Sequence, residues 1–364
     1  METRFRHGLV VVLLLMTAWT LVATATPARA AERPDCGGST LPGTPPASPI
    51  ANAGTPVAGA SPLTMVTDIR LPGNPARFDY QSLDPTSGRL YMAHMGAGQL
   101  VVVDTAARSV VGTVDDLPSV TGVLAVPEMW RVYAAVAGDH QVAVIDARTL
   151  AVAARVGKIE FPDGLAYAPS ARQVFVSDES GGGELVLDVD TNRVVATIDI
   201  GGEAGNTQYD AGSGCILVAV QSRDELVAID PGSDRVVGRY ALPDACKGPH
   251  GFTIDAAGRR AFVSCEDRAT LLVVDLTTMR VTEAFPVGDQ PDVLAFDAGW
   301  GRLYVASEAG TVSVFNTRGE IRPMGEYRAP HAHSVAVDPA THLVYLPLEN
   351  IDGRPVLRIL SATG

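Results

Sequence analysis

Seven polar positions recur along the chain at intervals of about 42 residues. They are occupied by Asp79, Thr121, Asp163, Gly205 with Asn206 beside it, His250, Asp292 and His333. Five of the seven are Asp or His, whose carboxylates and imidazoles bind divalent cations or transfer protons. If the fold brings these positions together, they form a site that no local motif would show.

The spacing of these residues is that of a sequence repeat. An apolar residue is followed by an aromatic residue or leucine and then by small or apolar residues, with the second place at Tyr91, Tyr133, Phe175, Leu217, Phe262, Tyr304 and Tyr345. Each repeat contains four short extended runs separated by turns, in the fifth repeat 251–254, 260–264, 270–275 and 281–285. Helical periodicity is nearly absent. The pattern predicts an all-β, seven-bladed β-propeller over residues 62–364, with four antiparallel strands per blade.

The two ends of the array predict how the ring closes. The last repeat stops at its third strand, 356–361, whereas an unassigned strand, 63–71, precedes the first repeat. This N-terminal strand should complete the seventh blade and leave the ring without an open edge. The innermost strand of each blade lines the channel, so the seven polar positions, which begin the first strands, should meet at one channel mouth.

The repeats resemble the YVTN repeat of seven-bladed, YncE-like propeller proteins over residues 63–361. Besides the second-strand motif, third-strand endings such as Val103-Asp104-Thr105, Ile145-Asp146-Ala147 and Val189-Asp190-Thr191 carry the resemblance. No copy contains Tyr-Val-Thr-Asn itself, and the sixth has Asn316 where others have Asp. The resemblance implies an exported propeller, but propellers host binding proteins, lyases, lactonases and oxidases alike, so activity must come from the site.

More ionisable residues are expected at the same mouth. The end of each second strand lies beside the start of the first, and there the chain has His94, Asp178, Glu179, Cys265, Glu266, Glu308 and Glu349. His331 and His333, two residues apart, could face one side of a strand. So many carboxylates and imidazoles predict a divalent cation site with Asp163, His250, Asp292 and His333 as candidate ligands. Zinc suits these atoms, and manganese or calcium suits them if oxygens dominate.

A purely structural interpretation competes with the metal site. Pro-Asp-Gly at 162–164 and Pro-His-Gly at 249–251 are common turn sequences. Polar residues there could simply satisfy backbone groups between blades, and Arg77 could neutralise Asp79 without any metal ion.

Two functions from different classes follow. In a binding or interaction module, the mouth would present Asp79, Thr121, Asp163, Asn206, His250, Asp292 and His333 to a small molecule, a cation or a cell-envelope protein. In a metal-dependent, lactonase-like hydrolase or lyase, the ion would polarise a carbonyl group, and the candidate catalytic residues are His250, His333, Glu266 and Glu308. We expect the module, because catalysis needs an asymmetric constellation and the sequence shows only a ring.

The N-terminal region is typical of an exported protein. Residues 1–30 form a predicted signal peptide with Arg4 and Arg6, an apolar run over 9–22 and an Ala28-Arg29-Ala30 cleavage site. Residues 31–61 are rich in Pro, Gly, Ala, Ser and Thr and are predicted to be a disordered linker. We therefore expect a periplasmic or secreted protein without a membrane span after cleavage.

The charge argues against a nucleic-acid partner. The full chain carries −13, and removing the +2 of the signal peptide leaves about −15 for the mature chain, which would repel a polyanion. Sequence motifs for haem attachment, a zinc protease, a serine nucleophile elbow and a phosphate-binding loop are absent. The closed edges of the ring predict a monomer.

Four cysteines in an exported chain invite pairing. Cys246 precedes the first strand of the fifth repeat and Cys265 ends its second strand, so the two should form a disulfide. Cys215 begins the second strand of the fourth repeat at the opposite mouth and is expected to be free and buried. Cys36, in the linker, has no evident partner.

Overall fold

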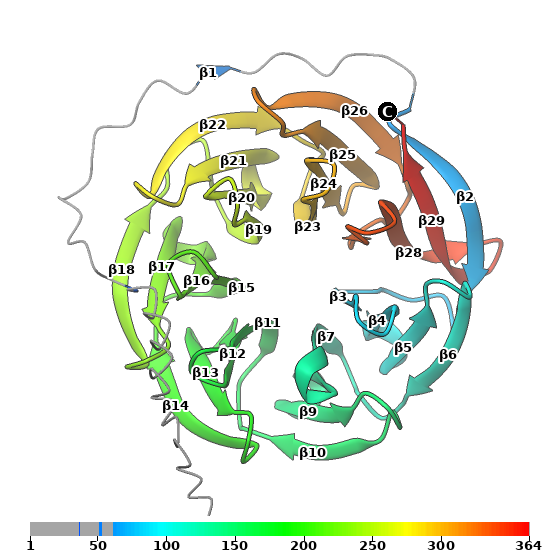
Figure 1. The fold of residues 1–364 in the computed structure, drawn as a ribbon, viewed down its shortest axis with the longest axis horizontal. Coiled ribbons are helices and arrows are strands. Elements are labelled where there is room, and N and C mark those ends of the chain that lie inside the picture. The colour runs from blue at the N-terminus through cyan, green and yellow to red at the C-terminus, as the bar shows by residue number, and fades with distance from the viewer. Residues whose placement is uncertain (1–35, 37–50, 53–60, 364) are drawn as a thin grey trace, which may run out of the picture. The chain divides into compact units, whose positions relative to one another are not determined.

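The computed structural model describes Cys36, Ala51–Asn52 and residues 61–363. In this part of the chain the strands form seven sheets around a central axis (Figure 1). The predicted seven-bladed β-propeller with four antiparallel strands per blade is confirmed. No helix among the described residues has the length and apolar character needed to cross a membrane.

Strand order in each blade runs from the axis outwards. The first blade contains β3 (Gln81–Asp84), β4 (Arg89–His94), β5 (Gln99–Asp104) and β6 (Ser109–Val114). The second contains β7 (Val120–Val126), β8 (Arg131–Val136), β9 (Gln141–Asp146) and β10 (Val152–Val156). The third contains β11 (Pro162–Ala168), β12 (Gln173–Asp178), β13 (Gly183–Asp188) and β14 (Arg193–Asp199). Its third strand therefore ends at Asp188, two residues before the predicted Val189-Asp190 ending.

The remaining blades repeat the pattern. The fourth contains β15 (Ala204–Asp210), β16 (Cys215–Val220), β17 (Glu225–Asp230) and β18 (Arg235–Ala241). The fifth contains β19 (Pro249–Asp255), β20 (Arg260–Cys265), β21 (Thr270–Asp275) and β22 (Arg280–Pro286). The sixth contains β23 (Pro291–Asp297), β24 (Arg302–Ser307), β25 (Thr311–Asn316) and β26 (Arg322–Arg328). The seventh contains β27 (Ala336–Val337), β28 (Leu343–Ile351), β29 (Arg354–Ala362) and β2 (Leu63–Arg70).

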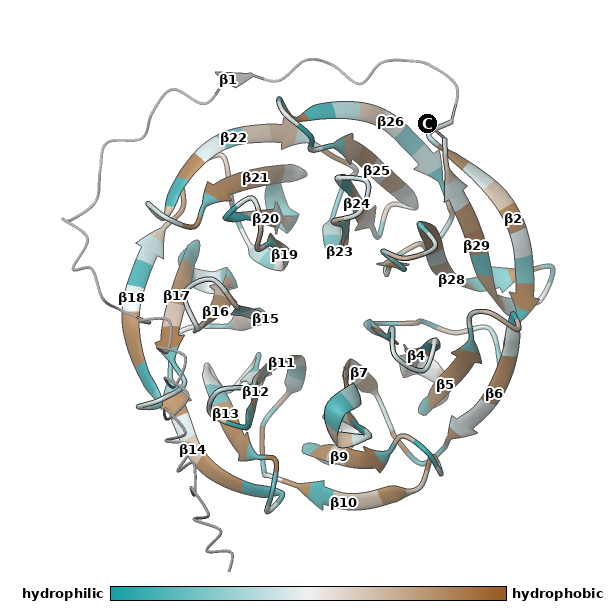
Figure 2. Ribbon diagram, viewed as in Figure 1, coloured by the Kyte–Doolittle hydropathy of each residue, from teal (hydrophilic) through white to brown (hydrophobic). Residues whose placement is uncertain are grey.

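The core lies between the blades and is built from the middle strands. The repeated second-place residues are all buried, among them Tyr91, Phe175 and Tyr345 at 0% exposure. The third strands are apolar along most of their length, as Figure 2 shows for β5, β9, β13 and β17. Each such strand packs against neighbouring blades on both faces, and so the strands are near-continuous apolar runs.

The N-terminal strand closes the ring as predicted. β2 pairs antiparallel with β29, from Leu63 opposite Ala362 to Arg70 opposite Val356. Arg358 of β29 donates to both carboxylate oxygens of Asp68 on β2, at 2.9 and 2.7 Å. The first and last segments of the array therefore share one sheet, which removes the edge that the last repeat would otherwise expose.

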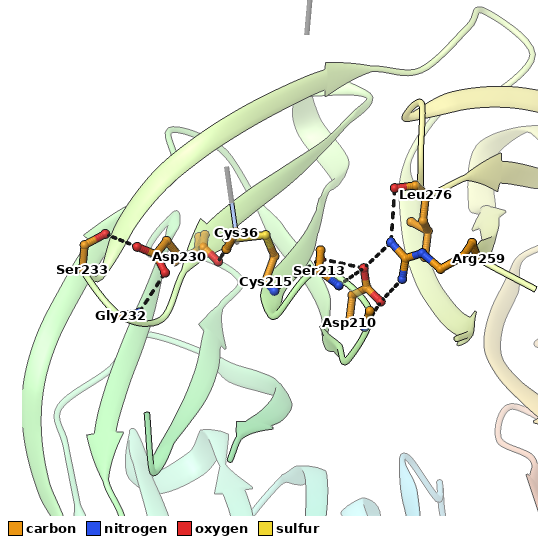
Figure 3. Close-up of a disulfide and its surroundings, with 11 residues drawn as sticks. Cys36, Asp210, Ser213, Cys215, Asp230, Gly232, Ser233, Arg259 and Leu276 are labelled. Atoms are coloured by element: carbon orange, nitrogen blue, oxygen red, sulfur yellow. Dashed lines mark hydrogen bonds and ion pairs between the residues drawn. A yellow bond between two sulfur atoms is a disulfide. The ribbon is translucent and has the colours of Figure 1, made fainter. Parts of the chain in front are cut away.

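The predicted Cys246–Cys265 disulfide is confirmed. The expectation that Cys215 is free is wrong, because Cys36 forms a disulfide with Cys215 across 179 residues of sequence (Figure 3). The composition of the linker gave no signal for this contact, which depends only on where the chain passes the ring. By the loop-entropy relation, the longer cross-link contributes about 5 kcal/mol and the shorter about 3 kcal/mol.

The N-terminal segment meets the ring at a second place. β1 (Ala51–Asn52) pairs parallel with β22 and adds a fifth strand to the fifth blade. Together with Cys36, this pairing places two points of the predicted disordered linker against the ring. The signal peptide predicted for residues 1–30 and the rest of the linker lie outside the described residues.

Candidate functional site

The starts of the inner strands meet at a small cavity, as the repeat predicts. The cavity measures roughly 170 Å³ and is lined by Arg77, Asp79, Met95, Thr121, Phe161, Asp163, Glu179, Gln221, His250, Glu266, Asp292 and Glu308. These residues come from the first six blades, and His333 of the seventh contacts Asp79, Asp292 and Glu308. Residues spread over more than 250 positions of sequence thus form one site.

A recurrent backbone irregularity positions the inner-strand side chains. In the second to sixth blades the register of the first strand shifts at the site residue, for example between Pro162 and Leu165 or between Pro291 and Leu294. Such β-bulges redirect a side chain away from the regular pleat. The bulged backbones approach closely, since a Cβ at Gly122 would lie 1.8 Å from the carbonyl oxygen of Asp163. Only glycine fits there, which explains the glycine after Thr121.

The structure places five of the predicted inner-strand residues at the cavity. Asp79, Thr121, Asp163, His250 and Asp292 all line the cavity. The Thr121 hydroxyl, however, donates to the carbonyl oxygen of Pro162 at 2.7 Å, so it holds neighbouring blades together.

Asn206 is buried but does not line the cavity. Its amide oxygen accepts a hydrogen bond from Gln208 at 3.2 Å.

The second-strand ends divide into two groups. Glu179, Glu266 and Glu308 line the cavity. His94 is instead buried against Phe78, with the ring centroids 4.0 Å apart, and Cys265 is in a disulfide. Asp178 accepts hydrogen bonds from loop backbone groups, and Glu349 does not line the cavity.

His331 and His333 do not share a strand. Residues 331–335 lie before β27, which begins at Ala336. His331 follows Pro330 with a φ of 61°, and its side chain is exposed, whereas His333 is buried. The turn after Pro330 therefore separates the two imidazoles.

Sequence reasoning missed four residues of the site. Met95 and Gln221 stand directly after second strands, the repeat position that Glu179, Glu266 and Glu308 also occupy, so the alignment could have identified them. Phe161 immediately precedes an inner strand. Tyr80 follows Asp79, and its hydroxyl lies 3.3 Å from His250 Nε2.

One part of the cavity, which we call the His333 side, contains Arg77, Asp79, Asp292, Glu308 and His333. His333 Nε2 lies 3.1 Å from Asp292 Oδ2 and 3.3 Å from Asp79 Oδ1, and its Nδ1 lies 3.1 Å from Glu308 Oε1. Arg77 reaches Glu308 Oε1 at 2.9 Å and His333 Nε2 at 3.1 Å. Three carboxylates thus surround one imidazole and one guanidinium.

Titration on the His333 side follows from these contacts. The close contact with His333, together with the charge of Arg77, lowers the pKa of Glu308 to about 2 despite partial burial. Burial opposes ionisation of Asp79, but His333 and Arg77 outweigh it and hold its pKa below the usual range. Burial likewise opposes protonation of His333, yet Asp292 and the other carboxylates raise its pKa well above the usual value.

The rest of the cavity, which we call the His250 side, contains Asp163, Glu179, His250 and Glu266. Here His250 Nε2 lies 3.4 Å from Asp292 Oδ1. Glu179 accepts a hydrogen bond from Gln221 at 3.3 Å. Among the described residues, no donor reaches Asp163 Oδ2 or pairs with His250 Nδ1, although both atoms are buried.

Carboxylates on the His250 side have raised pKa values. Burial, with the charge of Asp79, raises the pKa of Asp163 well above its usual range. Burial also raises the pKa of Glu179 and of Glu266, only partly offset by His250. The His250 side thus lacks an arginine that would neutralise its three carboxylates.

A metal ion fits the His333 side. One ligand atom from each of Asp292, Glu308 and His333 lies within 4.8 Å of the other two. Two carboxylate oxygens and one imidazole nitrogen suit zinc or manganese. Of the four predicted ligands, Asp292 and His333 belong to this group, Glu308 joins them, and Asp163 and His250 do not.

Comparisons with known proteins bear on the fold. No family model and no curated protein matches the chain. Among solved structures, a chain of hydrazine synthase from Kuenenia stuttgartiensis superimposes with a TM-score of 0.69 at 14% identity, covering 85% of this chain and 99% of that one. At that identity the likeness establishes a shared propeller-like fold and leaves the chemistry to the site itself.

Proposed function

We propose that this protein is an extracytoplasmic, YVTN-type (YncE-like) propeller that binds a divalent transition-metal ion at its channel mouth. The observation that carries the proposal is the convergence of Asp292, Glu308 and His333, with ligand atoms within 4.8 Å of one another. The two disulfides favour an oxidising compartment outside the cytoplasm. A small-molecule or cell-envelope partner and a monomeric state remain predictions.

The guanidinium of Arg77 supplies a positive charge at the proposed metal site on the His333 side. Its guanidinium contacts both Glu308 and His333, two of the three proposed ligands. The side chain is 45% exposed, so it can swing into solvent when an ion enters. The metal would therefore replace an internal positive charge, and the carboxylates would stay compensated before and after binding.

Zinc binding to the purified mature protein, with both disulfides formed, tests the proposal by titration calorimetry. We expect one bound Zn²⁺ per chain and a loss of affinity of more than about tenfold in both His333→Ala and Glu308→Gln. His331→Asn is the matched control, because its exposed imidazole lies outside the site and should leave binding unchanged. Zinc binding that is absent, or equal in all variants, would refute the proposal.

A metal-dependent hydrolase or lyase is the second candidate function. The imidazole of His250 lies beside the proposed ion through its 3.4 Å contact with Asp292, and Glu266 lines the same cavity. Either group could move a proton while the ion polarises a carbonyl group. Zinc-dependent turnover of a lactone or ester, lost in His250→Gln with zinc affinity retained, would establish this activity. Zinc binding without turnover would favour the binding module over the enzyme.

A further inference from the structure

The His250 side contains three carboxylates and no arginine or lysine. We propose that it is a subsite for the ammonium group of a small organic amine, with Asp163 as the principal acceptor. This subsite is distinct from the metal group, since none of Asp163, Glu179 and Glu266 belongs to that group. The inference does not depend on metal binding.

Asp163 is the residue that points to a ligand. Its side chain lines the cavity although the residue is only 4% exposed, and its Oδ2 has no hydrogen-bond partner among the described residues. Buried carboxylates are otherwise paired, because an unpaired one costs several kcal/mol of the free energy of folding. A cationic donor that enters the cavity would compensate the Asp163 carboxylate.

The arrangement favours an ammonium group over a second metal ion. Within the described residues, ligand atoms of three residues close enough to share one ion are found only for Asp292, Glu308 and His333. No such group of three forms among the carboxylates of the His250 side. A primary ammonium group needs only Asp163 as a charged acceptor, and its other N–H groups can donate to water.

The apolar part of the lining also suits an organic ligand. Met95 and Phe161 line the same cavity as the carboxylates. A short alkyl chain can pack against the thioether and the ring, and an aromatic face also attracts a neighbouring cation. The cavity of roughly 170 Å³ limits the ligand to a small amine.

The electrostatics of the His250 side agree with this assignment. Burial raises the pKa of Asp163, Glu179 and Glu266, and the charge of His250 offsets this only in part. A bound ammonium ion would add its positive charge to that of His250 and favour the ionised carboxylates.

Calorimetric titration of the mature protein with n-propylammonium tests the inference, with n-propanol as the uncharged probe of similar shape. We expect propylammonium to bind more than about tenfold tighter than propanol, and Asp163→Asn to remove most of that difference. Asp289→Asn, an exposed residue outside the cavity, is the matched control and should change nothing. Melting curves of each variant verify that the fold is intact.

Equal affinities for the two probes, or an unchanged propylammonium affinity in Asp163→Asn, would overturn the inference. Zinc titrations of the same samples separate it from the metal proposal. Asp163→Asn should retain zinc binding, whereas His333→Ala should lose it. The two titrations therefore distinguish a result against the amine subsite from a result against the metal site.

Discussion

The two sides of the cavity differ in how their carboxylates are compensated. On the His333 side, Asp79, Asp292 and Glu308 share an imidazole and a guanidinium, and the pKa values of Asp79 and Glu308 are lowered. On the His250 side, the imidazole of His250 only partly offsets the burial of the carboxylates, and their pKa values are raised. The repeat thus delivers similar residues to both sides, and their neighbours decide which carry a stable charge.

Replacing His333 should destabilise the fold more than replacing His250. His333→Gln removes an imidazole that contacts three carboxylates at 3.1 to 3.3 Å, whereas His250→Gln removes one with a single carboxylate contact at 3.4 Å. We expect the first to lower the free energy of unfolding by about 4 kcal/mol, because it leaves buried charges uncompensated, and the second to lower it by less. Urea denaturation at pH 7 measures both, and equal losses would contradict the division.

Glu184 isolates the effect of burial from that of a charged cluster. It is fully buried between the third and fourth blades, accepts a hydrogen bond from Thr207 at 2.6 Å, and has its pKa raised by burial to about 8. Because the folded state keeps a proton that the unfolded state has already lost, stability is fully present below about pH 4.5 and falls as pH rises to about 8.

The loss attributable to Glu184 should reach about 4 kcal/mol at pH 8. Denaturation midpoints followed across this pH range in wild type and Glu184→Gln measure it. The substitution should flatten the decline, and Glu160→Gln, at an exposed position, should leave it intact. A decline that persists in Glu184→Gln would show that burial alone does not shift this carboxyl group.

Arg77→Gln tests whether Arg77 competes with the metal ion. Removing the guanidinium frees Glu308 and His333 from an internal competitor, so zinc should bind about tenfold tighter, or by about 1.4 kcal/mol. Arg70→Gln, at an exposed position of β2, removes the same charge elsewhere and serves as the control. Weaker zinc binding in Arg77→Gln would mean that Arg77 supports the site instead of occupying it.

The fold and most of the residues that line the cavity can be predicted from the sequence. The division of the cavity into a His333 side and a His250 side cannot. Period, strand pattern and ring closure follow from the repeat, and alignment of the copies places Asp79, Asp163, His250 and Asp292 at one mouth. The contact of Arg77 with His333 depends on the non-strand segments before β3 and β27, including the turn after Pro330, which the period does not encode.

The second disulfide shows the same limit for the segment before the ring. Cys246 and Cys265 lie on one blade, so their separation of 19 residues and the strand pairing bring them together. Cys36 meets Cys215 only because of the path of a segment with no repeat pattern. Local periodicity carries no information about that path.

Diffraction from zinc-soaked crystals, collected on both sides of the zinc absorption edge, tests the central claim most directly. We expect one strong anomalous peak bounded by Asp292, Glu308 and His333, with the Arg77 side chain displaced from Glu308. A cavity without a peak, or a peak held by Asp163 and His250 in its place, would contradict it.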